Sequence, residues 1–98
     1  MLIWTPRARA DLKAIHDRIA KDSPQNAKRV AHEIRRKAHA LAEPPRVGRK
    51  VPELNDPQLR EISIYSWRLI YHLRESDVFI VTLVHKRRQL GAEDLAPS

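Results

Sequence analysis

Residues 59–88, LREISIYSWRLIYHLRESDVFIVTLVHKRR, decide the fold, because three apolar runs follow one another with only short polar breaks between them. In the first run Ile62 and Ile64 alternate with polar residues, which is the period of two of a half-buried strand. The second run, 67–73, alternates in the same way. The third, 78–84, is apolar almost throughout and rich in β-branched residues, which predicts a strand covered on both faces inside the sheet.

Two helices are predicted upstream of this stretch. Thr5-Pro6 and Ser23-Pro24 each place a capping hydroxyl before a proline, a pair typical of a helix start. Apolar residues then recur at helical spacing in both segments. In the first segment they are Ala8, Leu12, Ile15 and Ile19, and in the second Ala27, Val30, Ala31, Ile34, Ala38 and Leu41. The short link at 21–23 makes the two helices an antiparallel hairpin.

The remaining segments complete a single domain over residues 1–98. Residues 2–4 form a short apolar run that we interpret as a first strand, and Pro44-Pro45 is expected to end the second helix. Residues 44–58 are interpreted as a stiff irregular connection, and the tail 89–98 as a short helical turn or a disordered end. The predicted order is β-α-α-β-β-β. The simplest fold is α+β, a small, mostly antiparallel sheet with the helical hairpin on one face.

Composition limits the functional classes. The 98 residues include nineteen Lys and Arg against twelve Asp and Glu, and the net charge of +7 suits an anionic partner such as nucleic acid or an acidic protein. There is no cysteine, which excludes disulfides and thiolate chemistry. No apolar run approaches the roughly 20 residues of a membrane span. We therefore expect a cytoplasmic protein that does not contact a membrane.

Candidate chemistry is sparse. The histidines His16, His32, His39, His72 and His85 lack the spacing of a zinc helix, and we expect neither a metal nor a cofactor. A cationic cluster remains near the strands, formed by Arg60, Arg68, His85, Lys86, Arg87 and Arg88. Such a cluster could bind phosphate and support RNA cleavage, with His85 or Tyr71 transferring the proton. Alternatively, Arg68 pairs with Glu61 or another acid across the sheet.

An ordered set of segments resembles the ParE branch of the RelE/ParE superfamily, the toxins of bacterial type II toxin–antitoxin pairs. The segments are TPRARADLKAI at 5–15, IAKDSPQNAKRV at 19–30, PPRVGRKVPEL at 44–54, LREI at 59–62, WRLIY at 67–71 and VHKRR at 84–88. The resemblance covers nearly the whole chain and implies the same β-α-α-β-β-β order.

The resemblance implies one of two activities. RelE-like members cut mRNA on the ribosome with a basic set on the sheet, whereas ParE-like members are associated with poisoning DNA gyrase. Arg68 matches the family arginine of the Y-R-x-x-Y segment, with Trp67 in place of the usual tyrosine, and Arg87 matches the arginine after the last strand. The basic pair expected on the preceding strand is reduced to Arg60, with Ile62 at the second position. No tyrosine follows Arg88, and these departures favour the gyrase-directed branch.

The expected partner is therefore an acidic, ParD-like antitoxin with a ribbon-helix-helix segment, in a heteromeric complex, and the expected target is DNA gyrase. The Ala-rich hairpin beside a sheet predicts a groove for an amphipathic helix. We expect antitoxin contacts at Leu12, Ile15, Val30 and Ile34, where these are not already in the core, and at Arg60, Arg68 and Arg87. Two alternatives stay open: a ribonuclease that uses Arg68, His85 and Arg87, and a basic nucleic-acid-binding domain that uses the 28–50 face.

Overall fold

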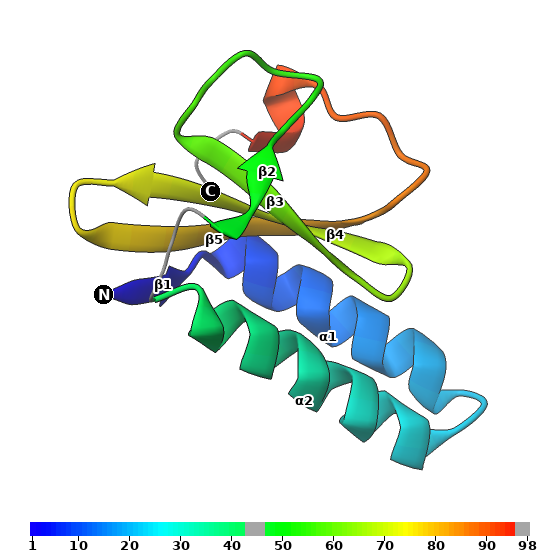
Figure 1. The fold of residues 1–98 in the computed structure, drawn as a ribbon. Coiled ribbons are helices and arrows are strands. Elements are labelled where there is room, and N and C mark those ends of the chain that lie inside the picture. The colour runs from blue at the N-terminus through cyan, green and yellow to red at the C-terminus, as the bar shows by residue number, and fades with distance from the viewer. Residues whose placement is uncertain (43–46, 96–98) are drawn as a thin grey trace.

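The computed structural model describes residues 1–42 and 47–95 and shows two layers, a sheet and a helical hairpin beneath it (Figure 1). The element order is β1 (Leu2–Trp4), α1 (Pro6–Ala20), α2 (Pro24–Ala40), β2 (Arg49–Lys50), β3 (Leu59–Ile64), β4 (Trp67–Arg74), β5 (Asp77–His85) and η2 (Ala92–Leu95). The predicted α+β architecture, with the helices on one face of a mostly antiparallel sheet, is confirmed.

The sheet has the strand order β1-β5-β4-β3-β2. Strands β2 to β5 pair antiparallel, while β1 pairs parallel with β5, so that Leu2 lies opposite Val78 and Trp4 opposite Ile80. The prediction that the apolar run 78–84 lies inside the sheet is confirmed, because β5 has β1 on one side and β4 on the other. The outermost strands of the sheet are β1 and β2.

Local capping sets both helix starts. The Thr5 side chain accepts a hydrogen bond from the backbone N–H of Ala8 at 3.1 Å, and that of Ser23 accepts one from Asn26 at 3.1 Å. Each satisfies a donor that has no partner inside the helix. The predicted starts are therefore confirmed, and α2 ends at Ala40. The proposed stop at Pro44-Pro45 lies outside the described residues.

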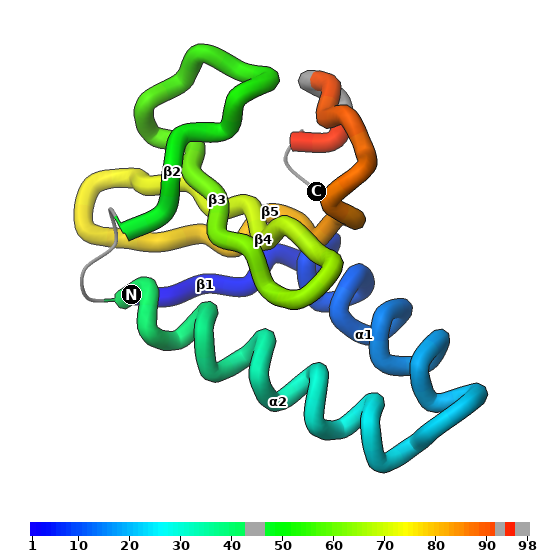
Figure 2. Tube along the Cα trace, turned by 45° about the vertical axis from the view of Figure 1, so that its right-hand side comes forward, coloured from blue at the N-terminus to red at the C-terminus, as the bar shows by residue number. Residues whose placement is uncertain are grey.

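Two apolar clusters lie on opposite faces of the sheet. The larger is between the sheet and the helices; it includes Leu69 and Tyr71 of β4 together with Ile34 of α2. The smaller includes Ile70, which alternates with those two β4 residues, and the buried Leu90. Figure 2 shows the β2–β3 connection and the C-terminal segment on the side of the sheet away from the helices. The second face is thus covered in part by irregular chain.

The structure corrects the prediction for the connection at 44–58 and decides the open one for the tail. The connection at 44–58 was predicted to be irregular, but it contains the two-residue strand β2, which pairs with β3. A strand of two residues is too short to show an alternating pattern in the sequence. This strand forms because the edge of β3 is available for pairing. The tail was left open between a helical turn and disorder, and its described part ends in the short helix η2.

Candidate functional site

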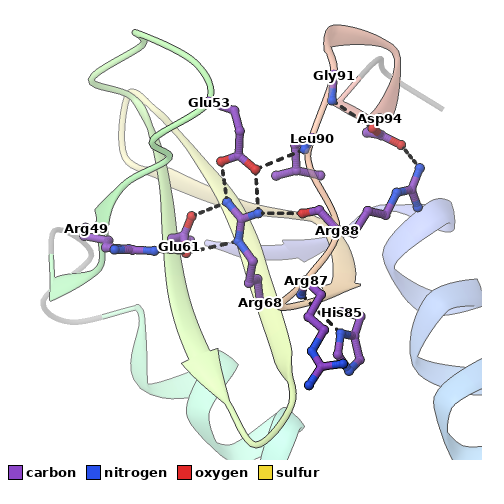
Figure 3. A network of polar contacts seen from close by, with 10 residues as sticks. All are labelled: Arg49, Glu53, Glu61, Arg68, His85, Arg87, Arg88, Leu90, Gly91 and Asp94. Carbon is purple, nitrogen blue, oxygen red and sulfur yellow. Dashed lines mark hydrogen bonds and ion pairs between the residues drawn. The ribbon is translucent and has the colours of Figure 1, made fainter.

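Arg68 is the centre of a buried ion network above β3 and β4 (Figure 3). Its guanidinium contacts the Glu61 carboxylate on the neighbouring strand at 2.6 Å and the Glu53 carboxylate at 2.6 Å and 2.7 Å. Arg68 is 6% exposed and Glu61 is 2% exposed. The alternative that Arg68 pairs with Glu61 across the sheet is confirmed, and Glu53 joins the pair from the β2–β3 connection.

All five N–H groups of Arg68 are used within this network. Nε donates to Glu61 at 3.2 Å, Nη2 to both carboxylates, and Nη1 to Glu53 and to the backbone carbonyl of Arg88 at 3.1 Å. Because a guanidinium has five donors and no acceptor, no N–H is left for a phosphate. The hydrogen bonds from Arg68 lower the pKa of Glu53 from 4.5 to about 2, and the two carboxylates raise the pKa of Arg68.

The C-terminal segment is fixed to the same network. The backbone N–H of Leu90 donates to Glu53 at 3.0 Å. Further along, the carboxylate of Asp94 accepts hydrogen bonds from the Gly91 N–H at 2.9 Å and from Arg88 and Arg7. The Gly91 hydrogen bond and the two nearby cations lower the pKa of Asp94. The sequence had given no sign that these acids hold the segment from Leu90 to Asp94 in place.

The predicted basic residues do not form one cluster. Arg68 and Arg87 line a common depression of about 610 Å³ beside Lys86 and Arg88, but His85 is not among the residues that line it. Arg87 is exposed, and its backbone N–H donates to Nδ1 of His85 at 3.2 Å. Arg60 lies on the other face of β3, where its Nη1 donates to the Gly48 carbonyl at 3.0 Å. The geometry therefore brings two of the three candidate catalytic residues together and leaves Arg60 apart.

The four apolar positions predicted to contact an antitoxin lie in the core. Leu12, Ile15, Val30 and Ile34 are all buried in the larger apolar cluster. The condition attached to them, that they are not already in the core, is not met in the isolated chain. Their spacing indicated an apolar face correctly, but spacing cannot show whether that face packs against the protein's own sheet or remains open.

Of these four residues only Leu12 also lines an open surface of the described chain. An open groove of about 1020 Å³ runs between the edge strand β1 and the two helices. Its apolar residues are Leu2, Ile3, Trp4, Leu12 and Ala31, and its basic residues include Arg9, Lys28 and Arg35. No ion pair involves Lys28 or Arg35 in the part of the chain that the structure describes. We call this surface the helix–strand groove.

The described residues contain no group of three or more His, Asp or Glu side chains arranged to hold a metal ion. Within the same residues, no helix is long and apolar enough to cross a membrane.

Comparison with known sequences assigns this chain to a family. A family profile described as the ParE toxin of the type II toxin–antitoxin system, parDE, matches residues 2–90. The chain belongs to the ParE toxin family. It is the toxin component of a type II toxin–antitoxin system, and its partner is an antitoxin. The resemblance seen in the ordered sequence segments is thereby confirmed.

Relatives agree with this assignment. The protein named Toxin RelE2 from Caulobacter vibrioides is 39% identical over 88 residues, which cover 89% of this ParE-family chain and 96% of that protein. A solved structure described as the chromosomal ParDE TA system from P. aeruginosa has the same fold, with a TM-score of 0.72 and 22% sequence identity. The match covers 86% of this chain and 92% of that one.

Proposed function

We propose that this toxin inhibits DNA gyrase in the cytoplasm when its antitoxin does not neutralise it. The proposal rests mainly on the environment of Arg68, because the ribonuclease alternative needs this side chain to be free to bind phosphate. Its guanidinium is buried and every N–H group is already bound. The family match to the ParE toxins supports the same choice.

Phosphate binding by Arg68 would require the ion network to open. Removing one partner from a buried ion pair typically costs about 3–5 kcal/mol, because the remaining charge is left without compensation. Here two carboxylates, Glu53 and Glu61, would lose their common cation. Arg87 and His85 are exposed, but the ribonuclease alternative also needs Arg68 as a third cation, and Arg68 is bound in the ion network. The geometry thus supports a structural role for Arg68.

The antitoxin fits the helix–strand groove. An apolar floor that includes Trp4 and Leu12, beside the cations Arg9, Lys28 and Arg35, matches an amphipathic segment with an acidic face. The outer edge of β1, with which no other described strand pairs, adjoins the groove and can accept an added strand. We infer a ParD-like acidic antitoxin with a ribbon-helix-helix segment, which binds here and forms a heteromeric complex. Contacts at Arg60 and Arg87 remain part of this proposal.

The deciding experiment is a pulse of toxin expression without antitoxin, followed by separate measurements of DNA breaks and of bulk mRNA. Growth arrest with DNA breaks and intact mRNA is expected, together with inhibition of supercoiling by purified gyrase. A double variant, His85→Gln with Arg87→Gln, is the matched control, because both side chains are exposed and should be replaceable without loss of folding. Rapid mRNA loss that this variant abolishes would overturn the proposal in favour of the ribonuclease.

A further inference from the structure

Two non-glycine residues of the described chain have left-handed backbone conformation, and both lie at the tips of β-hairpins. Tyr65 has φ = 54° and Glu75 has φ = 55°. Each is the first residue of a two-residue connection, between β3 and β4 or between β4 and β5. Such tight turns demand positive φ and favour Asn, Asp or Gly, because a Cβ atom disfavours that conformation. For a bulky side chain such as tyrosine, the conformation is an outlier.

Tyr65 is largely exposed at this tip, and no hydrogen bond of the described chain explains a tyrosine there. Tyr65 is 53% exposed, and only it, Met1 and Val47 are prominent exposed large hydrophobic residues in the described chain. Its phenol makes no hydrogen bond within the part of the chain that the structure describes. Glu75 forms the same kind of turn with a polar side chain. The Tyr65 side chain therefore carries a conformational cost that no hydrogen bond within the described residues offsets, and strain of this kind is often found at functional sites.

The surroundings of the two tips differ. Figures 1 and 2 show the β3–β4 turn beside the helical hairpin, whereas the β4–β5 turn lies at the opposite end of the sheet. The pKa of Arg36 on α2 is raised, mainly by its hydrogen bonds to Glu33 and in smaller part by Tyr65, which agrees with a tip close to α2. Helix α2 carries five Lys and Arg against one acid. Tyr65 is thus an exposed aromatic ring next to a positively charged surface.

We propose that Tyr65 is a contact residue through which the toxin holds its protein target. The phenol would enter an apolar pocket bordered by acidic side chains on the target, which complement the cations of α2. A solitary aromatic anchor is typical of a protein interface, whereas single-stranded nucleic acid is bound by several aromatics on which successive bases stack. The inference rests on the proposed function, since it requires a target protein.

This contact is separate from the antitoxin surface. The helix–strand groove is lined by residues of β1, α1 and α2, and Tyr65 is not one of them. Substitution at Tyr65 should therefore impair action on the target and leave antitoxin binding unchanged. A general loss of folding would impair both activities, so a variant that loses only its action on the target would support the proposal.

The test compares Tyr65→Asn with Glu75→Asn. Both variants place a residue that tolerates positive φ at a hairpin tip. If each relieves about 1 kcal/mol of backbone strain, each should raise the melting temperature by about 4–8 °C. Only Tyr65→Asn is expected to weaken toxicity, with about a 30-fold rise in the toxin concentration that half-inhibits supercoiling by purified gyrase. Tyr65→Phe should keep most of the activity.

The outcomes separate this inference from the proposed function. If the wild-type toxin arrests growth without inhibiting gyrase, the gyrase proposal fails, and the effects of Tyr65→Asn and Glu75→Asn on growth arrest still decide the role of Tyr65. If Tyr65→Asn is stable and as toxic as the wild type, the inference is wrong. It is also wrong if the variant mainly loses affinity for a 20-base-pair DNA duplex, or for the antitoxin. A wild-type toxin that causes no growth arrest contradicts both proposals.

Discussion

Arg68→Ala should be among the most destabilising single substitutions in this protein. The change removes the common cation of Glu53, which is largely buried, and Glu61, which is fully buried, and leaves Glu61 with only the exposed Arg49 as an ion-pair partner. The expected loss is about 3–5 kcal/mol, the usual cost of breaking a buried ion pair. A chain of 98 residues has a total unfolding free energy of about 5–15 kcal/mol. The loss is therefore a large part of the whole stability.

The assay is guanidinium chloride denaturation, in which the midpoint should fall by about 1–2 M. A triple variant provides the matched comparison: Arg68→Met, Glu61→Leu and Glu53→Gln together. It removes the charges of Arg68, Glu61 and Glu53, so that only the largely exposed Arg49 of the network keeps its charge. The new glutamine carbonyl can still accept the Leu90 N–H. Replacing a whole buried ion network by uncharged residues is often nearly neutral, so this variant should lie within about 2 kcal/mol of the wild type.

Two results would refute the reasoning. The first is an Arg68→Ala protein within about 1 kcal/mol of the wild type, because the network would then contribute little. The second is a triple variant as unstable as Arg68→Ala, because stability would then depend on the charges themselves. The triple variant also tests the role of Arg68 in toxicity: growth arrest by a folded protein without this guanidinium excludes it as a catalytic group.

Three further predictions concern stability and antitoxin binding. The pKa of Glu53 is lowered to about 2, so its stabilising contribution should be complete above about pH 4.5 and lost as the pH falls towards 2, measured by denaturation across that range. Gly48→Ala should cost about 1–3 kcal/mol in thermal denaturation, because the new Cβ would lie 2.5 Å from the Tyr71 hydroxyl. Lys28→Gln with Arg35→Gln should slow antitoxin association and weaken its salt dependence, measured by stopped flow.

Each of these predictions has its control. Glu53→Gln should flatten the acid side of the stability profile, and an unchanged profile contradicts the assignment to this carboxylate. Gly91→Ala alters a glycine outside the Tyr71 contact, so an equal loss at both positions would contradict the steric argument. Arg18→Gln with Arg74→Gln removes the same charge away from the helix–strand groove, and an equal effect on association would assign the rate to net charge alone.

The helices and main strands could be predicted from the sequence, because each depends on residues a few positions apart. The caps at Thr5 and Ser23 and the alternation at Ile62 and Ile64 are patterns of this kind, and they placed the helices and main strands correctly. Strand β2 was missed, because its two residues are extended only through their pairing with β3. The ordered segments also sufficed to place the chain in its toxin family.

Less of the candidate site could be predicted from the sequence. Pairing of Arg68 with Glu61 was foreseen as an alternative, because adjacent strands bring cross-strand neighbours together. The part played by Glu53 was not, since it enters from an irregular connection whose path no periodicity describes. The buried state of Ile15 and Val30 was also undecided, because an apolar helix stripe looks the same whether it packs on its own sheet or awaits a partner.

The sequence by itself therefore determined the two helices, the main strands, the fold class and the family, since these follow from local spacing and from an ordered set of short segments. Only the tertiary structure decided that Arg68 is bound on every donor, that Leu90 and Gly91 are held by Glu53 and Asp94, and that the open groove lies beside β1. The physical reason is that these features join residues distant in sequence, whose distances are fixed by strand register and packing.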